Sequence, residues 1–271
     1  MTNEEGVKDT CIGCHQEKIC YSLRKGVIKC ADCICDQVGK STMDLFRKAT
    51  RTIPNPVHVL VSISGGASSL FLWDLFKKRL GPYLNGKSAV VRKLEGISSL
   101  DIPNENSEYV INKIPEFTIS AVIEYAKTHD FNCVVLGDNT DHATLANFAT
   151  LSCGRPDLAH WYSTDDSTNY IPVTVSRPVR QCLLRELQFY CKQNNIKYDA
   201  SLSKMEKAFP HEIDLINHVL ADENGAMPFA VQKLGEKLPP FPQAGKCPIC
   251  NLPSPDNEIC SVCSTIESHN K

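Results

Sequence analysis

The sequence lacks several features that would place a protein outside the ordinary globular classes. Its 271 residues carry a formal net charge of −2, so any nucleic-acid contact must come from local basic patches or from a partner. No run of about 18 apolar residues is present, which argues against a membrane span. The first residues, MTNEEGVKDT, are acidic and polar, unlike a secretory signal or a transit peptide. We therefore expect a cytosolic protein with no membrane contact.

The sequence also shows no internal repeat and no low-complexity tract. Apolar residues make up 42% of the chain and charged residues 22%, a composition that can bury a real core. The unusual number is 14 cysteines, of which six lie between Cys11 and Cys35 and four between Cys247 and Cys263. Because a secretory signal is lacking, we expect these thiols to be metal ligands or buried side chains and not disulfides.

This clustering divides the chain into a cysteine-rich head, a central block and a cysteine-rich tail, over residues 1–40, 51–238 and 245–265. In the central block, apolar runs predict strands near residues 57–63, 88–94, 133–139 and 170–178. Amphipathic stretches predict helices near residues 69–79, 117–130, 142–152 and 180–194, the third capped by Asp141. Strands separated by helices of this length imply right-handed crossovers. The predicted fold is therefore an α/β domain whose parallel sheet carries helices on both faces.

Each end of the chain carries two C-x-x-C pairs, the spacing with which four thiolates surround one zinc ion. In the tail, nine residues separate the pairs, as in a zinc ribbon, and the predicted ligands are Cys247, Cys250, Cys260 and Cys263. In the head, fifteen residues separate them, and the predicted ligands are Cys11, Cys14, Cys30 and Cys33. Further candidates in the head are Cys20, Cys35 and His15. An iron–sulfur cluster also uses four thiolates, so it is the alternative to zinc at the head.

Residues 59–73, VLVSISGGASSLFLW, have the layout of a strand, a tight glycine turn and a helix. Glycines let the backbone approach a pyrophosphate, and the amides at a helix start donate to its oxygens. A second stretch, VVLGDNTDH, ends a later strand, where ligands bind in open α/β sheets. An ordinary tight turn is the alternative. The predicted nucleotide or phosphate site consists of Ser64, Gly65, Gly66, Ser68, Ser69, Gly137 and Asp141.

The turn from Ser64 to Ser69, SGGASS, resembles the S-G-G-x-D-S signature of the PP-loop ATP pyrophosphatases. These enzymes adenylate a carbonyl oxygen and then replace it with sulfur or nitrogen. Further motifs point to one family among these enzymes. They are the four-cysteine head, the serine in place of the loop acid, the stretches LSCGRPDL and RPVRQCLLRELQFYCKQNN, and the CPIC tail. Together, over most of the chain, they are similar to the eukaryotic cytoplasmic tRNA 2-thiolation protein 2 family.

The resemblance implies a subunit of the cytosolic complex that 2-thiolates the wobble uridine (mcm5s2U) of the tRNAs for lysine, glutamate and glutamine. Its expected partner is a catalytic paralogue in a heterodimer. That paralogue receives sulfur from a ubiquitin-related modifier with a C-terminal thiocarboxylate. The fold implied is that of the PP-loop, or adenine nucleotide alpha hydrolase-like, proteins.

This chain departs from the active relatives at the positions that handle magnesium. Ser68 stands where they carry an acid, and a hydroxyl cannot supply the charge that holds a hard cation. Their second motif, G-H-x-x-D-D, here reads GDNTDH, so only Gly137 and Asp141 carry over. The retained glycines are compatible with binding ATP without turning it over. We therefore predict no catalytic residue.

The central cysteines do not form a reactive pair, whereas the thiolating paralogues use one cysteine on each side of the second loop. Cys133 lies within an apolar strand and is expected in the core. Cys182 and Cys191 lie nine residues apart on one predicted helix, which suits packing. Cys153 is the central cysteine expected near the surface, and a redox role for it is the less favoured interpretation.

Two basic segments are candidates for contact with tRNA. One follows the head and contains Arg47, Lys48 and Arg51; the other follows the last predicted strand and contains Arg177 and Arg180. Arginine at a strand end beside a helix start can bind phosphate. The alternative for both segments is a solvated helix surface.

Two other functions compete with the role of a non-catalytic subunit. The chain could itself be an ATP-dependent tRNA sulfurtransferase, although the missing loop acid and the missing cysteine pair argue against it. It could also be a zinc-dependent adaptor without a role on RNA.

Overall fold

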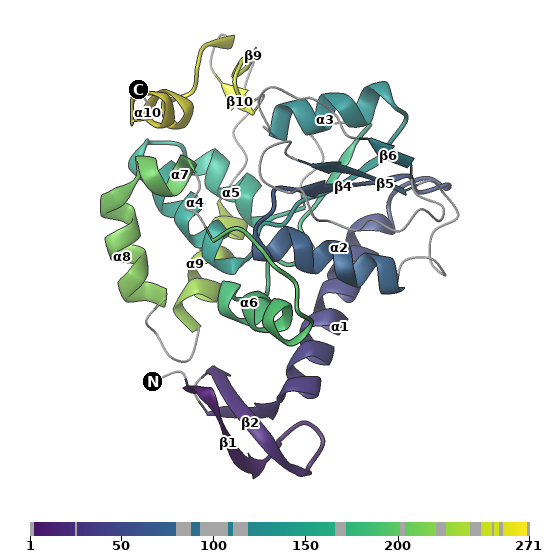
Figure 1. Cartoon of the computed structure of the whole chain (residues 1–271). Coiled ribbons are helices and arrows are strands. Elements are labelled where there is room, and N and C mark those ends of the chain that lie inside the picture. Colours follow the sequence, from purple (N-terminus) through teal and green to yellow (C-terminus); the bar gives the residue numbers. More distant parts are fainter. Residues whose placement is uncertain are drawn as a thin grey trace.

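The computed structural model describes residues 3–24, 26–79, 88–92, 108–110, 119–165, 172–200, 204–220, 226–238, 245–250, 252–254 and 257–269. An α/β body lies between the head, near the N-terminus, and the tail, near the C-terminus (Figure 1). Among the described helices, none is long and apolar enough to cross a bilayer.

The head is a small antiparallel sheet followed by a long helix. Its strands are β1 (Asn3–Thr10), β2 (Glu17–Arg24) and β3 (Val27–Cys30), paired in the order β1-β2-β3. Helix α1 (Ala31–Thr50) begins directly after Cys30 and runs into the body. The boundary predicted at residue 40 thus falls inside one continuous helix, which joins the head to the body.

The body contains a parallel sheet in the order β6-β5-β4-β7-β8. Its strands are β4 (Val59–Ile63), β5 (Ser88–Arg92), β6 (Glu108–Val110), β7 (Cys133–Val135) and β8 (Thr174–Ser176). Alternate residues of β4 face opposite sides, because side chains in a strand alternate. Val59, Val61 and Ile63 join the core beneath α1, α2 (Ala67–Arg79) and α6 (Leu184–Gln193), and Leu60 joins the core beneath α3 (Ile119–Thr128). This confirms the predicted α/β fold with helices on both faces.

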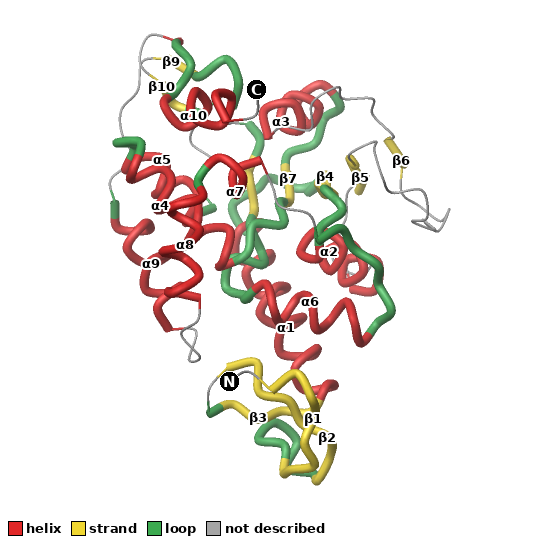
Figure 2. The backbone as a smooth tube through the Cα atoms, turned by 60° about the vertical axis from the view of Figure 1, so that its left-hand side comes forward, coloured by secondary structure: helices red, strands yellow, loops and turns green. Residues whose placement is uncertain are grey.

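Further helices form a bundle at one end of the sheet, where α4, α5, α8 and α9 lie together (Figure 2). The four helices of the bundle are α4 (Thr140–Ser152), α5 (Pro156–Ser163), α8 (Pro210–Leu220) and α9 (Ala226–Lys237), and the short helix α7 (Lys204–Ala208) precedes α8. The tail consists of β9 (Gly245–Lys246), β10 (Pro253–Ser254) and α10 (Ser261–His269), and α10 packs on α7.

The predicted strands contain β4, β5, β7 and β8, although residues 93–94 and 170–171 lie outside the described part of the chain. Strand β6 was not predicted. The helix predicted from residue 180 begins instead at Leu184, because residues 177–182 form turns: the Arg180 amide donates to the Arg177 carbonyl at 3.1 Å, and the Cys182 amide to the Val179 carbonyl at 2.9 Å.

Gly235 marks the closest approach between α9 and the helices beneath it. A Cβ atom there would lie 2.2 Å from Ser163 Oγ and 3.0 Å from the Ala159 carbonyl oxygen. We expect Gly235→Ala to lower the free energy of unfolding by about 1–3 kcal/mol, because overpacking forces the helices apart. Urea denaturation measures this. The matched control is Gly39→Ala, whose Cβ would meet the side-chain ends of Leu75, at 3.3 Å, and Arg79, at 3.4 Å. These flexible ends can shift, and alanine has the higher helix propensity. Equal stability of the Gly235 and Gly39 variants would contradict the close approach.

Candidate functional site

The predicted phosphate loop forms where β4 ends and α2 begins. Gly65 has φ +96°, a conformation that glycine adopts without strain. It lets the chain turn sharply from the buried strand into a helix that starts at Ala67. The first amides of α2 have no acceptor within their own helix, so the turn presents donors suited to an anion.

Hydrogen bonds within the loop hold its shape. The Ser69 hydroxyl donates to the Gly66 carbonyl at 3.0 Å and accepts from the Gly65 amide at 3.3 Å. Ser64 Oγ lies 3.3 Å from Ser69 Oγ. The Asp199 amide donates to the Gly65 carbonyl at 2.9 Å and ties the loop to the segment after α6.

The second loop, after β7, lies against the first. A Cβ atom on Gly137 would come within 3.1 Å of the Ser69 nitrogen, so glycine allows the two backbones to meet. Asn139 Nδ2 donates to Ser68 Oγ at 2.8 Å. The structure thus brings the residues predicted in the first loop together with Gly137 of the second.

Asp141 is not the N-cap of α4, as predicted. Asn139 is, since its side chain accepts from the His142 amide at 2.8 Å. Asp141 lies in the first helical turn and accepts from the Leu184 amide at 2.6 Å, so it caps the start of α6. Burial raises the pKa of its carboxyl. The sequence could not reveal this, because asparagine and aspartate two positions apart are equally good caps.

A buried ion pair that the sequence did not predict lies behind the second loop. Asp138 Oδ2 accepts from Arg177 Nε at 2.9 Å, and His142 Nδ1 lies 3.2 Å from Asp138 Oδ1. The Arg177 side chain is 0% exposed, and its guanidinium carbon lies 3.9 Å above the Trp161 ring. Burial alone would raise the pKa of Asp138, but His142 and Arg177 outweigh it and hold that pKa well below its usual range. Burial alone would lower the pKa of His142, and Asp138 raises it.

Arg177 and Arg180 are not placed as predicted for contact with tRNA. Arg177 is enclosed, and Arg180, which is also buried, is paired through Nη1 with the Asp165 carboxylate. Asp165 also accepts from the Arg177 amide at 2.7 Å. Arg177 therefore joins the end of β8 to Asp138 after β7, and Arg180 joins the turn after β8 to the segment that follows α5. The predicted phosphate contact fails because these side chains point into the core and not away from the helix start.

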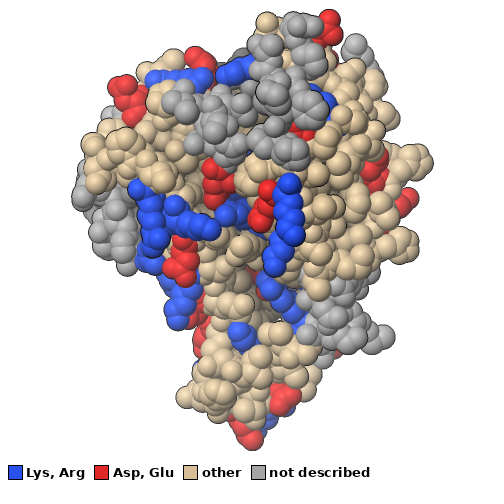
Figure 3. All heavy atoms as spheres, turned by 180° about the vertical axis from the view of Figure 1, so that it is seen from behind, with Lys and Arg blue, Asp and Glu red and all other residues tan. Residues whose placement is uncertain are grey.

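The other basic segment lies on the surface. Arg47, Lys48 and Arg51 are exposed at the end of α1, and Arg47 pairs with Asp44 at 3.1 Å. On the face seen in Figure 3, Lys and Arg side chains gather across the middle of the molecule, with acidic side chains between them.

This exposed segment and the phosphate loop lie at opposite edges of the sheet. Helix α1 ends beside the segment that leads into the start of β4, where Asn132 Nδ2 donates to the Pro56 carbonyl at 2.9 Å. Asn132 directly precedes β7. The loop follows the other end of β4, so one phosphate group cannot contact both places.

Both predicted metal clusters form. In each, the four sulfur atoms lie within 4.8 Å of one another, and the ligand sets are Cys11, Cys14, Cys30 and Cys33, and Cys247, Cys250, Cys260 and Cys263. Metal–sulfur bonds of about 2.3 Å in a tetrahedron put sulfur atoms about 3.8 Å apart. The separations Cys14–Cys30, 3.9 Å, and Cys250–Cys260, 3.8 Å, match that value. The residues present therefore fit one tetrahedral metal ion in each cluster.

Backbone amides surround the sulfur atoms, as expected where thiolates carry negative charge. In the head, the Gly13 and Cys30 amides donate to Cys11 Sγ at 3.3 and 3.2 Å. Burial raises the pKa of Cys11, but these amides outweigh it and lower that pKa to about 5. The further candidate Cys20 is directed elsewhere, since its thiol donates to the Asp9 carbonyl at 3.5 Å.

Cys133, Cys182 and Cys191 are buried as predicted, but Cys182 lies in the turn before α6 and does not share a helix with Cys191. Burial raises the pKa of the Cys133, Cys182 and Cys191 thiols to about 12, so they are protonated packing residues. Cys153 is only partly buried; its sulfur lies 3.8 Å from Thr265 Oγ1 of α10. It therefore contacts the tail at the end of α4.

No protein-family model matches the sequence, and no curated protein matches it either. Among solved structures, the U34-tRNA thiolase NcsA from Methanococcus maripaludis, determined with its [4Fe-4S] cluster, aligns with a TM-score of 0.62. The alignment covers 96% of each chain at 16% identity. The two proteins share a fold. An NH3-dependent NAD synthetase from Campylobacter jejuni, in complex with nitrate, covers 75% of this chain and 93% of its own at 15% identity, but its TM-score of 0.34 is too low to support an argument.

The likeness extends over the head and tail as well as the body, because nearly all of both chains is aligned. It confirms the predicted α/β fold, which the two proteins share. At this identity the similarity concerns architecture, and the chemistry must be inferred from the side chains of this chain.

Proposed function

We propose that this protein is a non-catalytic subunit of the cytosolic complex that 2-thiolates the wobble uridine of the tRNAs for lysine, glutamate and glutamine. It acts in a heterodimer with a catalytic paralogue, which receives sulfur from the thiocarboxylated ubiquitin-related modifier. One observation supports a non-catalytic role: the polar side chains of both loops form hydrogen bonds and ion pairs with one another or with the body.

Three contacts make this point. The Ser68 hydroxyl accepts from Asn139, the Asp138 carboxylate is held by Arg177 and His142, and the Asp141 carboxylate caps α6. Magnesium on a nucleotide needs carboxylate or hydroxyl oxygens that face the phosphates. Here each of these groups already has a partner within the protein, which supports binding without turnover.

The role on tRNA is supported by the fold shared with a U34-tRNA thiolase and by the exposed cations at the end of α1. Arg47, Lys48 and Arg51 fit contact with the RNA backbone, which supplies most of the affinity for nucleic acids. Their position, away from the phosphate loop, suits a subunit that holds tRNA while a second protein performs the reaction.

We assign zinc to both four-cysteine clusters. The sulfur separations are those of a single tetrahedral ion, and a closed set of four thiolates without an open position is typical of structural zinc. Bound zinc would stabilise the head and the tail, which are too small to fold around cores of their own.

Nucleotide turnover by the purified chain tests the proposal. We expect no release of pyrophosphate from ATP by this chain with tRNA present, and turnover when the paralogue is added. In cells, depletion of the protein should remove 2-thiouridine from the three tRNAs, measured by mass spectrometry of nucleosides. Thiolation of tRNA by this chain alone would show instead that it is the enzyme. Normal 2-thiouridine in depleted cells would support the zinc-dependent adaptor.

A further inference from the structure

A cavity of about 180 Å³ lies between the sheet of the head and α1. Its walls are aliphatic side chains: Leu23 and Val27 from the sheet, Ile34 and Val38 from α1, and Ile12 from the loop between β1 and β2. An aliphatic cavity of about 150 Å³ accepts benzene, so this one has room for a single six-membered ring. The larger two-ring system of a purine fits it less well.

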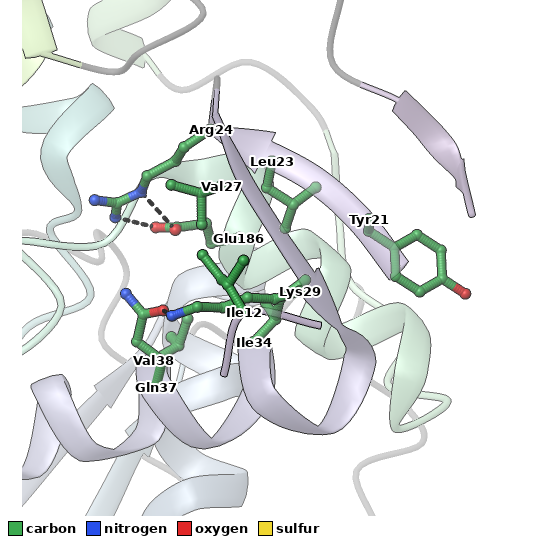
Figure 4. Close-up of a pocket in the computed structure, with 10 residues that line it drawn as sticks. All are labelled: Ile12, Tyr21, Leu23, Arg24, Val27, Lys29, Ile34, Gln37, Val38 and Glu186. Carbon is green, nitrogen blue, oxygen red and sulfur yellow. Dashed lines mark hydrogen bonds and ion pairs between the residues drawn. The ribbon is translucent and has the colours of Figure 1, made fainter. Parts of the chain in front are cut away.

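Two polar pairs lie together on one side of this cavity, and the Tyr21 ring points away from them (Figure 4). Arg24 binds Glu186 through Nε and Nη2, each at 2.7 Å. Lys29 Nζ donates to Gln37 Oε1 at 2.5 Å. The cavity therefore combines an apolar interior with a polar mouth.

The two pairs leave donors unused at the mouth. Within the described part of the chain, no hydrogen bond involves Arg24 Nη1 or Gln37 Nε2, and Lys29 Nζ has two protons beyond the one given to Gln37. The Arg24 guanidinium is held in place, since its carbon lies 4.9 Å from the Phe229 ring centroid. With one carboxylate against two cations, the mouth carries a net positive charge.

We infer that this cavity binds an unpaired pyrimidine nucleotide of RNA, with the base in the aliphatic interior. Lys29 and Arg24 contact the phosphate, and the Gln37 amide donates to a carbonyl oxygen of the base. Proteins that recognise RNA by sequence bind the unstacked bases of loops and form hydrogen bonds to their edges. The inference rests on the proposed function, because it names the part of the tRNA substrate that the head would hold.

The chemistry of the mouth favours RNA over a protein side chain. An aliphatic side chain would fill the interior but would offer no acceptor to Arg24 Nη1, to the remaining Lys29 protons or to the Gln37 amide group. A nucleotide supplies both a flat ring and acceptor oxygens at the correct end. The basic residues Arg47 and Lys48 lie farther along the same helix, α1, so one RNA strand could contact both places.

The test measures binding of full-length, metal-loaded protein to a short oligouridylate by fluorescence anisotropy, and to free UMP by NMR. Val38→Phe fills the cavity and should weaken oligouridylate binding at least about tenfold, as the loss of one base contact does. Lys29→Gln should weaken it severalfold and reduce the salt slope by about 0.7. The matched control is Lys8→Gln, an exposed lysine of the same sheet that does not line the cavity.

Retention of both metal ions verifies that the Val38→Phe variant still folds. Gln37 is exposed, so Gln37→Ala tests the same site without a change in the core. Tighter binding of oligouridylate than of UMP, with the same dependence on the variants, supports RNA as the source of the nucleotide. Equal binding by Lys29→Gln, Gln37→Ala and Lys8→Gln overturns the inference, while tRNA binding by the wild type would leave the proposed function standing. Loss of a protein partner from Val38→Phe with unchanged RNA binding would assign the cavity to that partner. Absence of all RNA binding by the wild type overturns both proposals.

Discussion

Asp138→Asn should lower the free energy of unfolding by about 3–5 kcal/mol, because it leaves a charged arginine in the interior without its partner. The substitution keeps the shape of the side chain and removes only the charge. Arg177 is fully enclosed and stacks on Trp161, so its guanidinium cannot reach water to recover the loss. Urea denaturation of the metal-loaded protein measures the change.

Two controls separate the buried charge from a general effect of substitution. Asp44→Asn breaks the exposed pair with Arg47 and should cost less than about 1 kcal/mol. Adding Arg177→Met to Asp138→Asn should recover much of the lost stability, since the unpaired charge is then gone. A single variant as stable as Asp44→Asn would show that Asp138 and Arg177 do not form the pair described.

The sequence predicted the features that depend on close neighbours in the chain. Two cysteines three residues apart are typical of a metal knuckle, so spacing favoured both ligand sets, although the head offered Cys20, Cys35 and His15 as further candidates. The glycine turn after β4 was likewise readable, because φ +96° at Gly65 suits glycine and the flanking apolar runs mark a strand and a helix.

The pair between Asp138 and Arg177 could not be predicted, because the two residues lie 39 positions apart and meet only when β7 and β8 align. From sequence, an arginine at a strand end is equally compatible with a surface phosphate contact. The parallel register of β7 and β8 brings Arg177 behind the second loop, and Trp161 from α5 closes over it. The burial of Arg177 thus depends on contacts between β7, β8 and α5, which no local sequence pattern encodes.

The direction of α1 likewise could not be predicted from the sequence, and it separates the two segments predicted to bind tRNA. The sequence grouped Arg47 with Arg177 as phosphate-binding candidates, but α1 runs from the head toward the starts of the strands. Its basic end therefore lies at the edge opposite to the phosphate loop. Strand β6, Glu108–Val110, was also not predicted.

Loss of one cysteine ligand in the tail should remove the metal ion and unfold the tail. Cys260→Ser should release about one metal ion per chain, because the remaining thiolates cannot complete the tetrahedron. Structural zinc contributes about 10–16 kcal/mol of binding free energy to such small units. Leu252 and Val262, which the tail packs into the core beneath α3 and α5, should then become exposed. Metal analysis measures the ion, and hydrogen exchange of residues 245–269 measures the opening of the tail.

The matched control is Cys153→Ser, which changes a cysteine that touches the tail but lies outside both ligand sets. Its metal content should stay at that of the wild type, with protection of α10 nearly unchanged. The body should remain folded in Cys260→Ser, because the central sheet is built entirely from β4 to β8. Unfolding of the sheet together with the tail would contradict this and would make the tail metal part of the main core. Full metal content in Cys260→Ser would remove this cysteine from the ligand set.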